Sequence, residues 1–184
     1  MSVLKQLFVI MTNQYTHITH KDIPIFINEE STVLILGSLP SVKSREYGFY
    51  YMHPQNRFYK VLSSIFDEIE PLSVDDRKEF LKKHCIALFD VIYECDIIGS
   101  SDSSIKNAAP IDIKSILDKY PNIRVIGING GKAKSLFDKY LLPMADQYDI
   151  KVICLPSTSP ANARMGVGEL VDEYGKLFTK QNNY

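Results

Sequence analysis

The sequence predicts a three-layer α/β/α fold around a central, mostly parallel sheet of four or five strands. Three observations lead to this prediction. Four short apolar runs recur along the chain, amphipathic helical patterns fall between them, and turn-forming or small polar residues follow each run. Such an alternation of strands and helices is typical of a parallel sheet covered by helices on both faces.

The strands are predicted from runs that are continuously apolar rather than alternating. A strand covered on both faces has this pattern because neither face meets water. The four strong candidates are Val33–Leu36, Ile86–Ile92, Val125–Ile128 and Val152–Leu155. A weaker fifth candidate lies at Ile23–Ile27.

Helices are predicted where apolar residues recur every three or four positions. The first follows His53, with Pro54 suited to its first turn. Its apolar face consists of Phe58, Val61, Leu62, Ile65 and Phe66.

Clear start and stop signals mark the later helices. Ser73 and Asp76 predict a capping box for a helix that runs to about His84. Asp112 is suited to cap a helix that Pro121 ends. Two further helices are indicated by the sets Ala133, Leu136, Phe137, Tyr140 and Leu141, closed before Pro143, and Val167, Leu170, Val171, Tyr174 and Leu177.

The length and composition suit one domain. The chain has 184 residues, of which 45% are hydrophobic and 23% charged, as in ordinary globular proteins. We expect an N-terminal extension over residues 1–20 and the domain over residues 21–184. No apolar stretch reaches the roughly 18–20 residues that span a bilayer, and Leu7–Met11 is too short for a signal-peptide core. We therefore expect a cytoplasmic monomer that does not bind membranes.

The cysteines and the net charge exclude some functions. Cys85, Cys95 and Cys154 lie far apart, so they form neither a paired metal spacing nor a disulfide framework. We expect them to be small hydrophobic residues in or beside strands, with no zinc, iron–sulfur cluster or other cofactor. The net charge of −1 argues against a bulk electrostatic nucleic-acid binder. It remains compatible with DNA contact through a local patch.

We expect a ligand-binding site at the carboxyl ends of the predicted strands. Open parallel sheets bind ligands beyond those ends. The strands run into Gly37–Ser41, Tyr93–Asp102, Asn129–Gly131 and Pro156–Pro160, which are rich in turn-forming and small polar residues. These residues are therefore expected on one rim of the sheet.

The first segment of chemical interest runs from Gly37 to Phe58, with the sequence GSLPSVKSREYGFYYMHPQNRF. Gly37 and Pro40 favour a tight exit from the strand. The aromatic residues of the segment are able to stack on a planar base, or to form a lid over the sheet. An ordinary loop and helix cap is an equally good interpretation of any single residue here. The prominent side chains are Tyr47, Phe49, Tyr50, Tyr51, His53, Asn56 and Arg57.

The second segment, Leu155–Arg164, places three hydroxyl residues between two prolines directly after a strand. A stiff loop of this kind is able to hold DNA phosphates and to push a small wedge into a groove. The alternative is a crossover loop that only caps the final helix.

Together and in this order, the two segments resemble the two active-site motifs of the uracil-DNA glycosylase superfamily. The stretch YGFYYMHPQNRFYKVL is similar to the mismatch-specific uracil/thymine glycosylases. GSLPS and STSPANA are similar to the hypoxanthine-DNA (DNA-deoxyinosine) glycosylase branch. The order of elements agrees over nearly the whole chain after about residue 20. The resemblance implies a uracil-DNA glycosylase-like α/β fold.

Leu39 departs from the pattern of the uracil-cleaving members. Many of them have Asn or Asp at this position to orient the attacking water, and a leucine forms no hydrogen bond. The resemblance to the deoxyinosine branch implies that Asn56 takes this role. Because an amide does not titrate usefully, catalysis would depend mainly on fixed donors that stabilise the departing base.

The resemblance and the residue chemistry together predict three groups of site residues. The catalytic group is Asn56 and Ser38. The base-binding group is Tyr51, which would stack on the extruded base, with His53, Asn129 and Leu39. The DNA-binding group is Ser41, Ser44, Arg57, Ser157, Ser159, Pro160, Ala161, Asn162 and Arg164. No metal ligand is predicted.

Several polar residues have structural alternatives. An amide at Asn129 can pair with the carbonyl and N–H of hypoxanthine or uracil, a pattern that adenine reverses, or it can serve the Asn-Gly-Gly turn. His53 can contact the base or a phosphate, or only hold its loop. For Asp90 we favour a structural role. Ser100–Ser104 resembles a loop of the deoxyinosine branch, without an assigned role.

The predicted function is DNA repair by base excision. The enzyme would flip a deaminated base out of DNA and hydrolyse its N-glycosidic bond by water attack at C1′. Hypoxanthine is the favoured base, and a monofunctional glycosylase is expected because no lysine is clearly placed for Schiff-base chemistry.

Three alternative functions compete with this prediction. One is a mismatch uracil/thymine glycosylase, which Leu39 disfavours. Another is a non-catalytic nucleic-acid-binding relative, with which Leu39 is consistent. The third, an α/β hydrolase using Ser38 or Ser157, lacks the Gly-x-Ser-x-Gly elbow.

Overall fold

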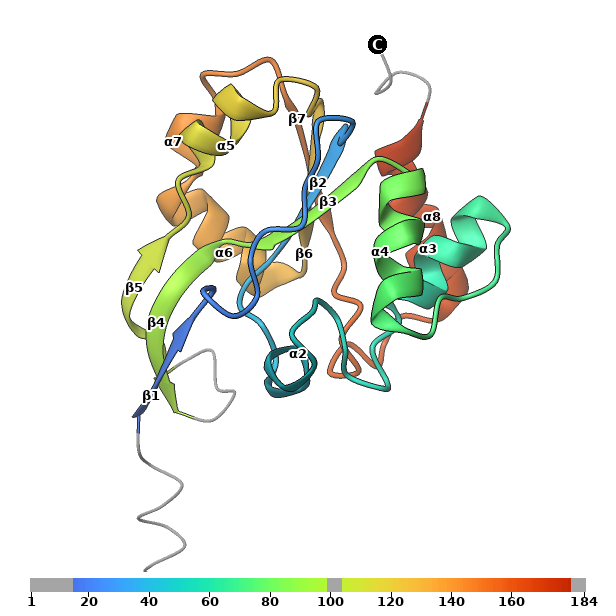
Figure 1. Cartoon of the computed structure of the whole chain (residues 1–184), viewed down its shortest axis with the longest axis horizontal. Coiled ribbons are helices and arrows are strands. Elements are labelled where there is room, and N and C mark those ends of the chain that lie inside the picture. The colour runs from blue at the N-terminus through green and yellow to red at the C-terminus, as the bar shows by residue number, and fades with distance from the viewer. Residues whose placement is uncertain (1–14, 99–103, 180–184) are drawn as a thin grey trace, which may run out of the picture.

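The computed structural model describes residues 15–98 and 104–179, which contain two sheets. The larger sheet has four parallel strands in the order β3-β2-β6-β7. Helices cover both faces of this sheet (Figure 1). The predicted three-layer α/β/α fold is therefore confirmed.

Strands and helices alternate along most of the chain. The elements are β1 (Tyr15–Thr19), β2 (Val33–Gly37), α2 (Val42–Tyr47), α3 (Phe58–Phe66), α4 (Val74–Lys83), β3 (Ile86–Asp90), β4 (Ile92–Ile98), β5 (Lys106–Pro110), α5 (Ile113–Lys119), β6 (Val125–Asn129), α6 (Gly131–Tyr140), α7 (Leu142–Ala145), β7 (Lys151–Leu155), α8 (Val167–Gly175) and the 3₁₀ helix η2 (Lys176–Phe178). The apolar run Leu7–Met11 lies outside the described residues, as do residues 99–102 of the predicted loop Tyr93–Asp102 and residues 100–103 of the segment Ser100–Ser104.

The core lies between the large sheet and its two helical layers. In Figure 1, α3, α4 and α8 lie to the right of the sheet and α5, α6 and α7 to its left. Every residue of β2, β3 and β6 is buried, which explains why these strands are continuously apolar. β7 is an edge strand and only Leu155 in it is buried. The apolar side chains of α3 pack against those of α8.

The strand register brings the functional loops to one rim. Gly37 pairs with Asp90 across β2 and β3, and Asn129 pairs with Leu155 across β6 and β7. The four strands therefore end at similar heights. Figure 1 shows the segments that follow them gathered beneath the sheet, where the turn after α2 lies beside the loop after β7.

The sequence does not predict the smaller sheet, in which β1, β4 and β5 pair in antiparallel fashion. The predicted strand Ile86–Ile92 ends at Asp90, and the chain enters β4 after Val91. β5 has the sequence KNAAP, which has weak strand propensity. β1 falls within the stretch assigned to an N-terminal extension. The candidate strand Ile23–Ile27 is wrong, because only Phe26 forms a bridge there, with Leu88.

The helix signals are mostly confirmed. Ser73 and Asp76 form a reciprocal capping box, and the Asp112 side chain accepts a hydrogen bond from the Ser115 N–H. The placement of Pro54 in a first helical turn is wrong, since α3 begins at Phe58 and Pro54 lies in the preceding turn. The short helix α2 is not predicted, because it lacks an apolar repeat.

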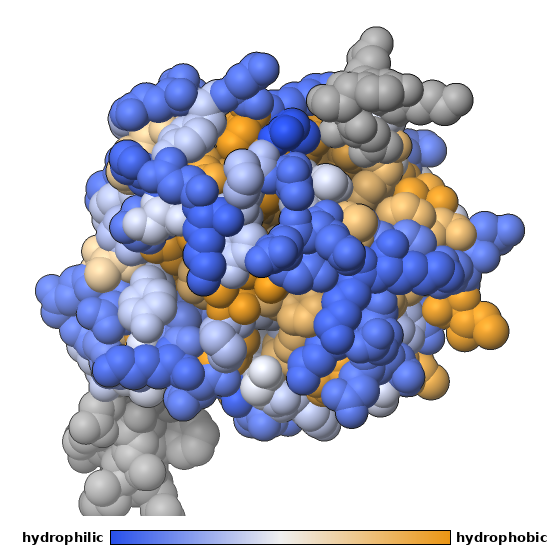
Figure 2. Space-filling view, turned by 45° about the horizontal axis from the view of Figure 1, so that its top comes forward, coloured by the Kyte–Doolittle hydropathy of each residue, from blue (hydrophilic) through white to orange (hydrophobic). Residues whose placement is uncertain are grey.

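The face of the molecule seen in Figure 2 is mainly hydrophilic. Figure 2 shows hydrophobic residues gathered at the right edge, on the side of α3 and α4. Ile69 and Leu72, in the connection between those helices, are largely exposed. No helix among residues 15–98 and 104–179 has the length and apolar character needed to traverse a bilayer. Cys95 is buried in β4, whereas Cys154 is exposed on the edge strand β7.

Candidate active site

A cavity of about 840 Å³ opens at the carboxyl ends of β2, β3 and β6. It is lined by residues that follow β2, by residues 129–133 around the start of α6, and by the loop after β7. The volume falls in the usual range for small-molecule sites and accommodates a purine. The two separated segments singled out in the sequence thus form one concave site.

Most of the predicted site residues line this cavity. They are Ser38, Leu39, Ser41, Ser44, Tyr51, Asn56, Asn129, Ser157, Ser159, Ala161, Asn162 and Arg164. His53, Arg57 and Pro160 are not among the lining residues. Pro160 is exposed at the outer edge of its loop.

β2 ends at a position where no side chain would fit. A Cβ at Gly37 would lie 2.2 Å from Oδ1 of Asp90, the paired residue on β3. The chain then passes through Ser38 and Leu39, both half-buried. Leu39 packs against the core while lining the cavity, so it forms an apolar part of the wall.

Ser41 and Ser44 begin α2. The Ser41 hydroxyl oxygen accepts a hydrogen bond from the Ser44 N–H at 3.1 Å and contacts the Ser44 hydroxyl at 3.0 Å. Ser44 is buried, and its oxygen also accepts from the Met52 N–H at 3.4 Å. Ser44 therefore serves the fold, whereas the exposed Ser41 is the better placed of the two for a DNA phosphate.

The aromatic turn after α2 buries two tyrosines in different ways. The Tyr50 hydroxyl donates to the carbonyl oxygens of Ile23 and Pro24, at 3.3 and 3.1 Å. The Tyr51 ring stacks on Phe58, with centroids 3.9 Å apart. One face of Tyr51 is thus covered, which leaves only the other face for the predicted stacking on a base.

Tyr51 has two further unusual features. Its φ of 57° lies in the left-handed region, which costs a non-glycine residue about 1 kcal/mol or more and often marks a functional position. Its hydroxyl is buried without a hydrogen-bond partner among the described residues. Burial raises the pKa of Tyr51, so the hydroxyl stays protonated and remains a donor.

Asn56 lies half-buried in the cavity wall, just before α3. Its Oδ1 accepts a hydrogen bond from the Phe58 N–H at 3.0 Å, which fixes the amide relative to the helix start. Within the described part of the chain, its Nδ2 has no partner. A fixed amide with a free N–H₂ group and a spare lone pair is suited to hold a water molecule.

His53 supports the turn that presents Asn56. Its carbonyl oxygen accepts from the Asn56 N–H at 2.8 Å, and its Nδ1 accepts from the Gln55 N–H at 3.2 Å. Because His53 does not line the cavity, its structural alternative fits the geometry better than contact with the base.

Arg57, which the sequence assigns to DNA binding, is engaged by the backbone of the second loop. Its guanidinium donates to carbonyl oxygens of the second loop: to Thr158 at 3.4 Å, to Ser159 at 3.1 Å, to Asn162 at 2.7 Å and to Met165. Its backbone N–H also donates to the Thr158 carbonyl. Through these hydrogen bonds Arg57 joins the two loops.

The second loop is stabilised by its own polar side chains. The Ser157 hydroxyl oxygen accepts from the Ser159 N–H, and the Ser159 hydroxyl oxygen accepts from the Ala161 N–H. Nδ2 of Asn162 donates to the Ser157 carbonyl at 2.9 Å. This leaves Arg164, exposed at the cavity rim, as the cationic side chain of the loop.

Asn129 is engaged by Thr158. Its Nδ2 donates to the Thr158 hydroxyl at 3.1 Å, and its Oδ1 accepts from the Thr158 N–H at 3.2 Å. Both residues are buried. The bidentate edge of the amide that the sequence assigns to base reading is therefore occupied by Thr158.

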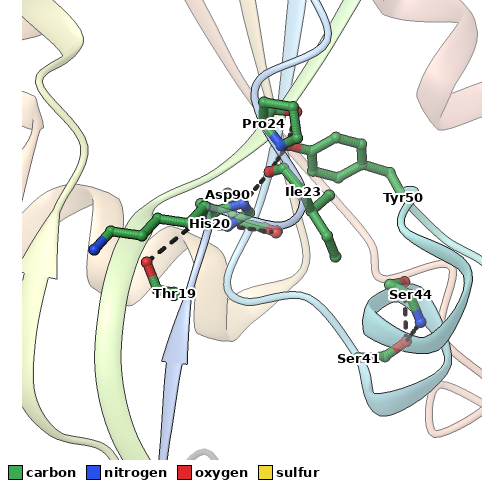
Figure 3. A network of polar contacts seen from close by, with 9 residues as sticks. Thr19, His20, Ile23, Pro24, Ser41, Ser44, Tyr50 and Asp90 are labelled. Carbon is green, nitrogen blue, oxygen red and sulfur yellow. Dashed lines mark hydrogen bonds and ion pairs between the residues drawn. The ribbon is translucent and has the colours of Figure 1, made fainter.

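A buried ion pair joins Asp90, which lines the cavity, to His20 behind it (Figure 3). Nε2 of His20 lies 3.2 Å from Oδ2 of Asp90, and both side chains are almost fully buried. Nδ1 of His20 donates to the Ile23 carbonyl oxygen at 2.7 Å, so this nitrogen carries a proton. Burial disfavours the imidazolium, but contact with the Asp90 carboxylate outweighs this effect and raises the pKa of His20.

Arg45 on α2 is a second residue that the sequence does not single out. It lines the cavity, and its Nη1 is buried without a hydrogen-bond partner among the described residues. Burial lowers the pKa of Arg45, yet a guanidinium stays charged in proteins. A cation that has no ion-pair partner in the described part of the chain and lies at the edge of a cavity is suited to bind an anion.

These residues carry no motif that would reveal them. His20 and Asp90 are 70 positions apart, and Arg45 lies in a segment with no apolar repeat. Within the described part of the chain, no group of three or more His, Cys, Asp or Glu side chains is arranged to hold a metal ion. The site thus combines an apolar wall at Leu39, a fixed amide at Asn56 and buried polar groups on its floor.

The chain is similar to one described protein family. The family model described as "Uracil DNA glycosylase superfamily" matches residues 24–180. Two curated relatives, each named "Hypoxanthine DNA glycosylase", come from Methanosarcina barkeri and Methanosarcina acetivorans. Each is 34% identical over 142 residues, which cover 77% of this chain and 87% of the relative.

A solved structure has a similar fold. The solution NMR structure of a candidate uracil DNA glycosylase from Methanosarcina acetivorans superimposes with a TM-score of 0.70 and 29% identity. The match covers 85% of this chain and 96% of the other. The residues that line the cavity lie within the matched residues 24–180, apart from Ile18 of β1.

Proposed function

Because the chain belongs to the uracil DNA glycosylase superfamily, we propose that it is a monofunctional DNA glycosylase that removes hypoxanthine from DNA. The observation that carries this proposal is the joining of two separated loops around one cavity large enough for a purine. Two relatives named hypoxanthine DNA glycosylase support the choice of base. The protein would act as a monomer in the cytoplasm on DNA that contains a deaminated base.

The reaction needs a base turned out of the duplex, a water molecule near C1′ and stabilisation of the departing base. Flipping costs a few kcal/mol, and less for a mismatched pair. Asn56 would hold the water through its free Nδ2 and spare lone pair. Water adds at C1′ as the C1′–N9 bond breaks, the bonding electron pair leaves with the base, and a proton from the water is returned to it.

A panel of duplexes tests the proposal. Matched duplexes would contain deoxyinosine, uracil, xanthine or only normal bases, and the released base would be identified by mass. We expect hypoxanthine to be released, with strand breaks only after hot alkali. Release of uracil alone would support a uracil glycosylase, whereas binding without release would support a non-catalytic relative. Breaks before alkali would indicate a lysine nucleophile, and Lys132 lines the cavity.

Arg45 provides a testable contact to the DNA backbone. Each lost phosphate contact lowers the salt dependence of duplex binding, expressed as the slope of log K against log salt concentration, by about 0.9. We expect this decrease for Arg45→Ala, measured by fluorescence anisotropy on undamaged duplex. Arg124→Ala is the matched control, because Arg124 precedes β6 at the opposite rim and contacts the Pro121 carbonyl. An unchanged slope for Arg45→Ala would show that Arg45 does not contact a DNA phosphate.

A further inference from the structure

The cavity contains buried polar atoms that the fold leaves unsatisfied. Among the described residues, four buried side-chain atoms have no hydrogen-bond partner: Nε2 of His20, Nη1 of Arg45, the Tyr51 hydroxyl and Oδ2 of Asp90. Arg45, Tyr51 and Asp90 line the cavity, and His20 pairs with Asp90. Of these four atoms, Nε2 of His20 and Oδ2 of Asp90 face each other as an ion pair at 3.2 Å. Nη1 of Arg45 and the Tyr51 hydroxyl are left, and because an unpaired buried polar group costs about 1–3 kcal/mol, their position in the cavity wall indicates that a ligand satisfies them.

Tyr51 and Asp90 lie next to each other on the cavity floor. The Tyr51 hydroxyl is 3.4 Å, and Oδ1 of Asp90 is 2.2 Å, from the point where a Cβ of Gly37 would stand. Because Gly37 has no Cβ, the Asp90 carboxylate is able to occupy that point. The two oxygens are therefore close enough to meet neighbouring atoms on one edge of a planar base, yet they form no hydrogen bond with each other.

The two groups have opposite hydrogen-bonding character. The Tyr51 hydroxyl stays protonated and has a hydrogen to donate. A carboxylate only accepts, and the His20 imidazole on its far side holds Asp90 in place through Oδ2. The floor of the cavity thus presents a donor beside an acceptor, in a part of the site from which most water is excluded.

We propose that Tyr51 and Asp90 read the base, with the Tyr51 hydroxyl donating to its carbonyl oxygen and the Asp90 carboxylate accepting from its ring N–H. This inference rests on the proposed function and assigns the base recognition that Asn129, engaged by Thr158, does not supply. Hypoxanthine presents this pair through O6 and N1–H. Uracil presents the same pair through O4 and N3–H.

The same pair rejects the parent bases. Adenine has an amino group where hypoxanthine has its carbonyl, and a lone pair where hypoxanthine has N–H, so both contacts would become repulsive. Cytosine differs from uracil in the same way. A site built to bond a particular N–H rejects an analogue without it by a large factor. Guanine presents the same edge as hypoxanthine, so its exclusion depends on the higher cost of opening a matched pair.

His20 reduces the electrostatic repulsion between the Asp90 carboxylate and the departing base. The base carries the electrons of the broken C1′–N bond, so an isolated negative charge next to it would oppose the reaction. The imidazolium of His20, 3.2 Å from Oδ2, neutralises the charge of Asp90 while leaving Oδ1 available. The pair therefore accepts a hydrogen bond without placing a net negative charge on the cavity floor.

Two variants test the two contacts separately. Tyr51→Phe keeps the ring on Phe58 and removes only the hydroxyl. Asp90→Asn keeps the shape and provides an amide that is able to donate to N1 of adenine. Tyr59→Phe is the matched control, because it also removes one buried tyrosine hydroxyl, which donates to the Tyr50 carbonyl and does not line the cavity.

Base release and binding would be measured on duplexes containing hypoxanthine, adenine or unsubstituted purine, which lacks the carbonyl. Tyr51→Phe is expected to lower release of hypoxanthine about tenfold to a hundredfold, with release of purine nearly unchanged. Asp90→Asn is expected to lower the preference for hypoxanthine over adenine by roughly a hundredfold or more. Tyr59→Phe should change neither ratio. Because ratios are compared, the different stability of each glycosidic bond cancels.

Equal losses on hypoxanthine and purine in Tyr51→Phe, or an unchanged preference in Asp90→Asn, would overturn the inference while leaving the proposed function intact. If Asp90→Asn fails to fold in thermal melts, Tyr51→Phe decides alone, because it leaves the His20–Asp90 pair in place.

Binding to duplex with non-cleavable 2′-fluoro-deoxyinosine separates recognition from catalysis. A wild-type protein that prefers this duplex without releasing base, and loses the preference in Tyr51→Phe, would support the inference and refute the proposed function. A wild-type protein that neither releases nor prefers hypoxanthine would refute both.

Discussion

Asn56→Ala is expected to slow the release of hypoxanthine by about 10²–10³-fold, as is typical for the loss of one preorganised polar group at a reaction centre. The amide is fixed by the Phe58 N–H, so its free atoms reach the cavity in a set orientation. The alanine leaves nothing to hold the attacking water. Single-turnover rates at saturating enzyme measure the effect without interference from product release.

Asn56→Ala also removes a hydrogen bond that stabilises α3, and this loss of stability has to be distinguished from the loss of catalysis. Without Oδ1, the Phe58 N–H at the start of α3 loses its acceptor, which costs about 0.5–2 kcal/mol of stability. Asn56→Asp keeps this acceptor and also has a lone pair for water, so it should be more active than the alanine variant at equal folding. Gln55→Ala is the neighbouring control, because that side chain is exposed outside the cavity. A nearly normal rate in Asn56→Ala would remove Asn56 from the mechanism.

The parts of the fold that the sequence predicts are those with a local signal. β2, β3 and β6 are continuously buried and therefore continuously apolar. The capping side chains Ser73 and Asp112 lie within three residues of the N–H groups that they bind. The rule that ligands bind beyond the strand ends then places the cavity correctly, because it depends only on strand direction.

The missed parts depend on contacts between distant residues. Nothing near His20 indicates that it faces Asp90, and β1 and β5 are recognisable only once β4 lies between them. Asn129 has the right type and place for a base reader, but its amide is bonded to Thr158, 29 positions later. A hydrogen-bonding group is assigned from sequence as if it were free, and only the fold determines whether a partner already occupies it.

Arg57 is the clearest example of a side chain whose hydrogen-bonding groups are already occupied by the fold. Its replacement is therefore expected to cause a large loss of stability. Its guanidinium is part-buried and donates to four carbonyl oxygens of the second loop. Hydrogen bonds from a charged group contribute about 1.5–3 kcal/mol each, although losses at one site do not add. We expect Arg57→Lys to lower the free energy of unfolding by about 2–4 kcal/mol, because a lysine ammonium cannot reproduce the planar fork.

The two interpretations of Arg57 predict opposite results in two measurements. If it joins the loops, urea unfolding of Arg57→Lys shows a clear loss of stability, and the salt slope of binding to undamaged duplex stays at the wild-type value. If it binds a phosphate, Arg57→Lys retains the charge and is nearly as stable as wild type, while Arg57→Ala lowers the salt slope by about 0.9. Arg164→Ala is the matched comparison, since Arg164 is exposed at the cavity rim and should change the slope without changing stability. A stable Arg57→Lys protein would show that the second loop keeps its shape without the guanidinium. Other contacts would then have to hold the two loops together around the cavity.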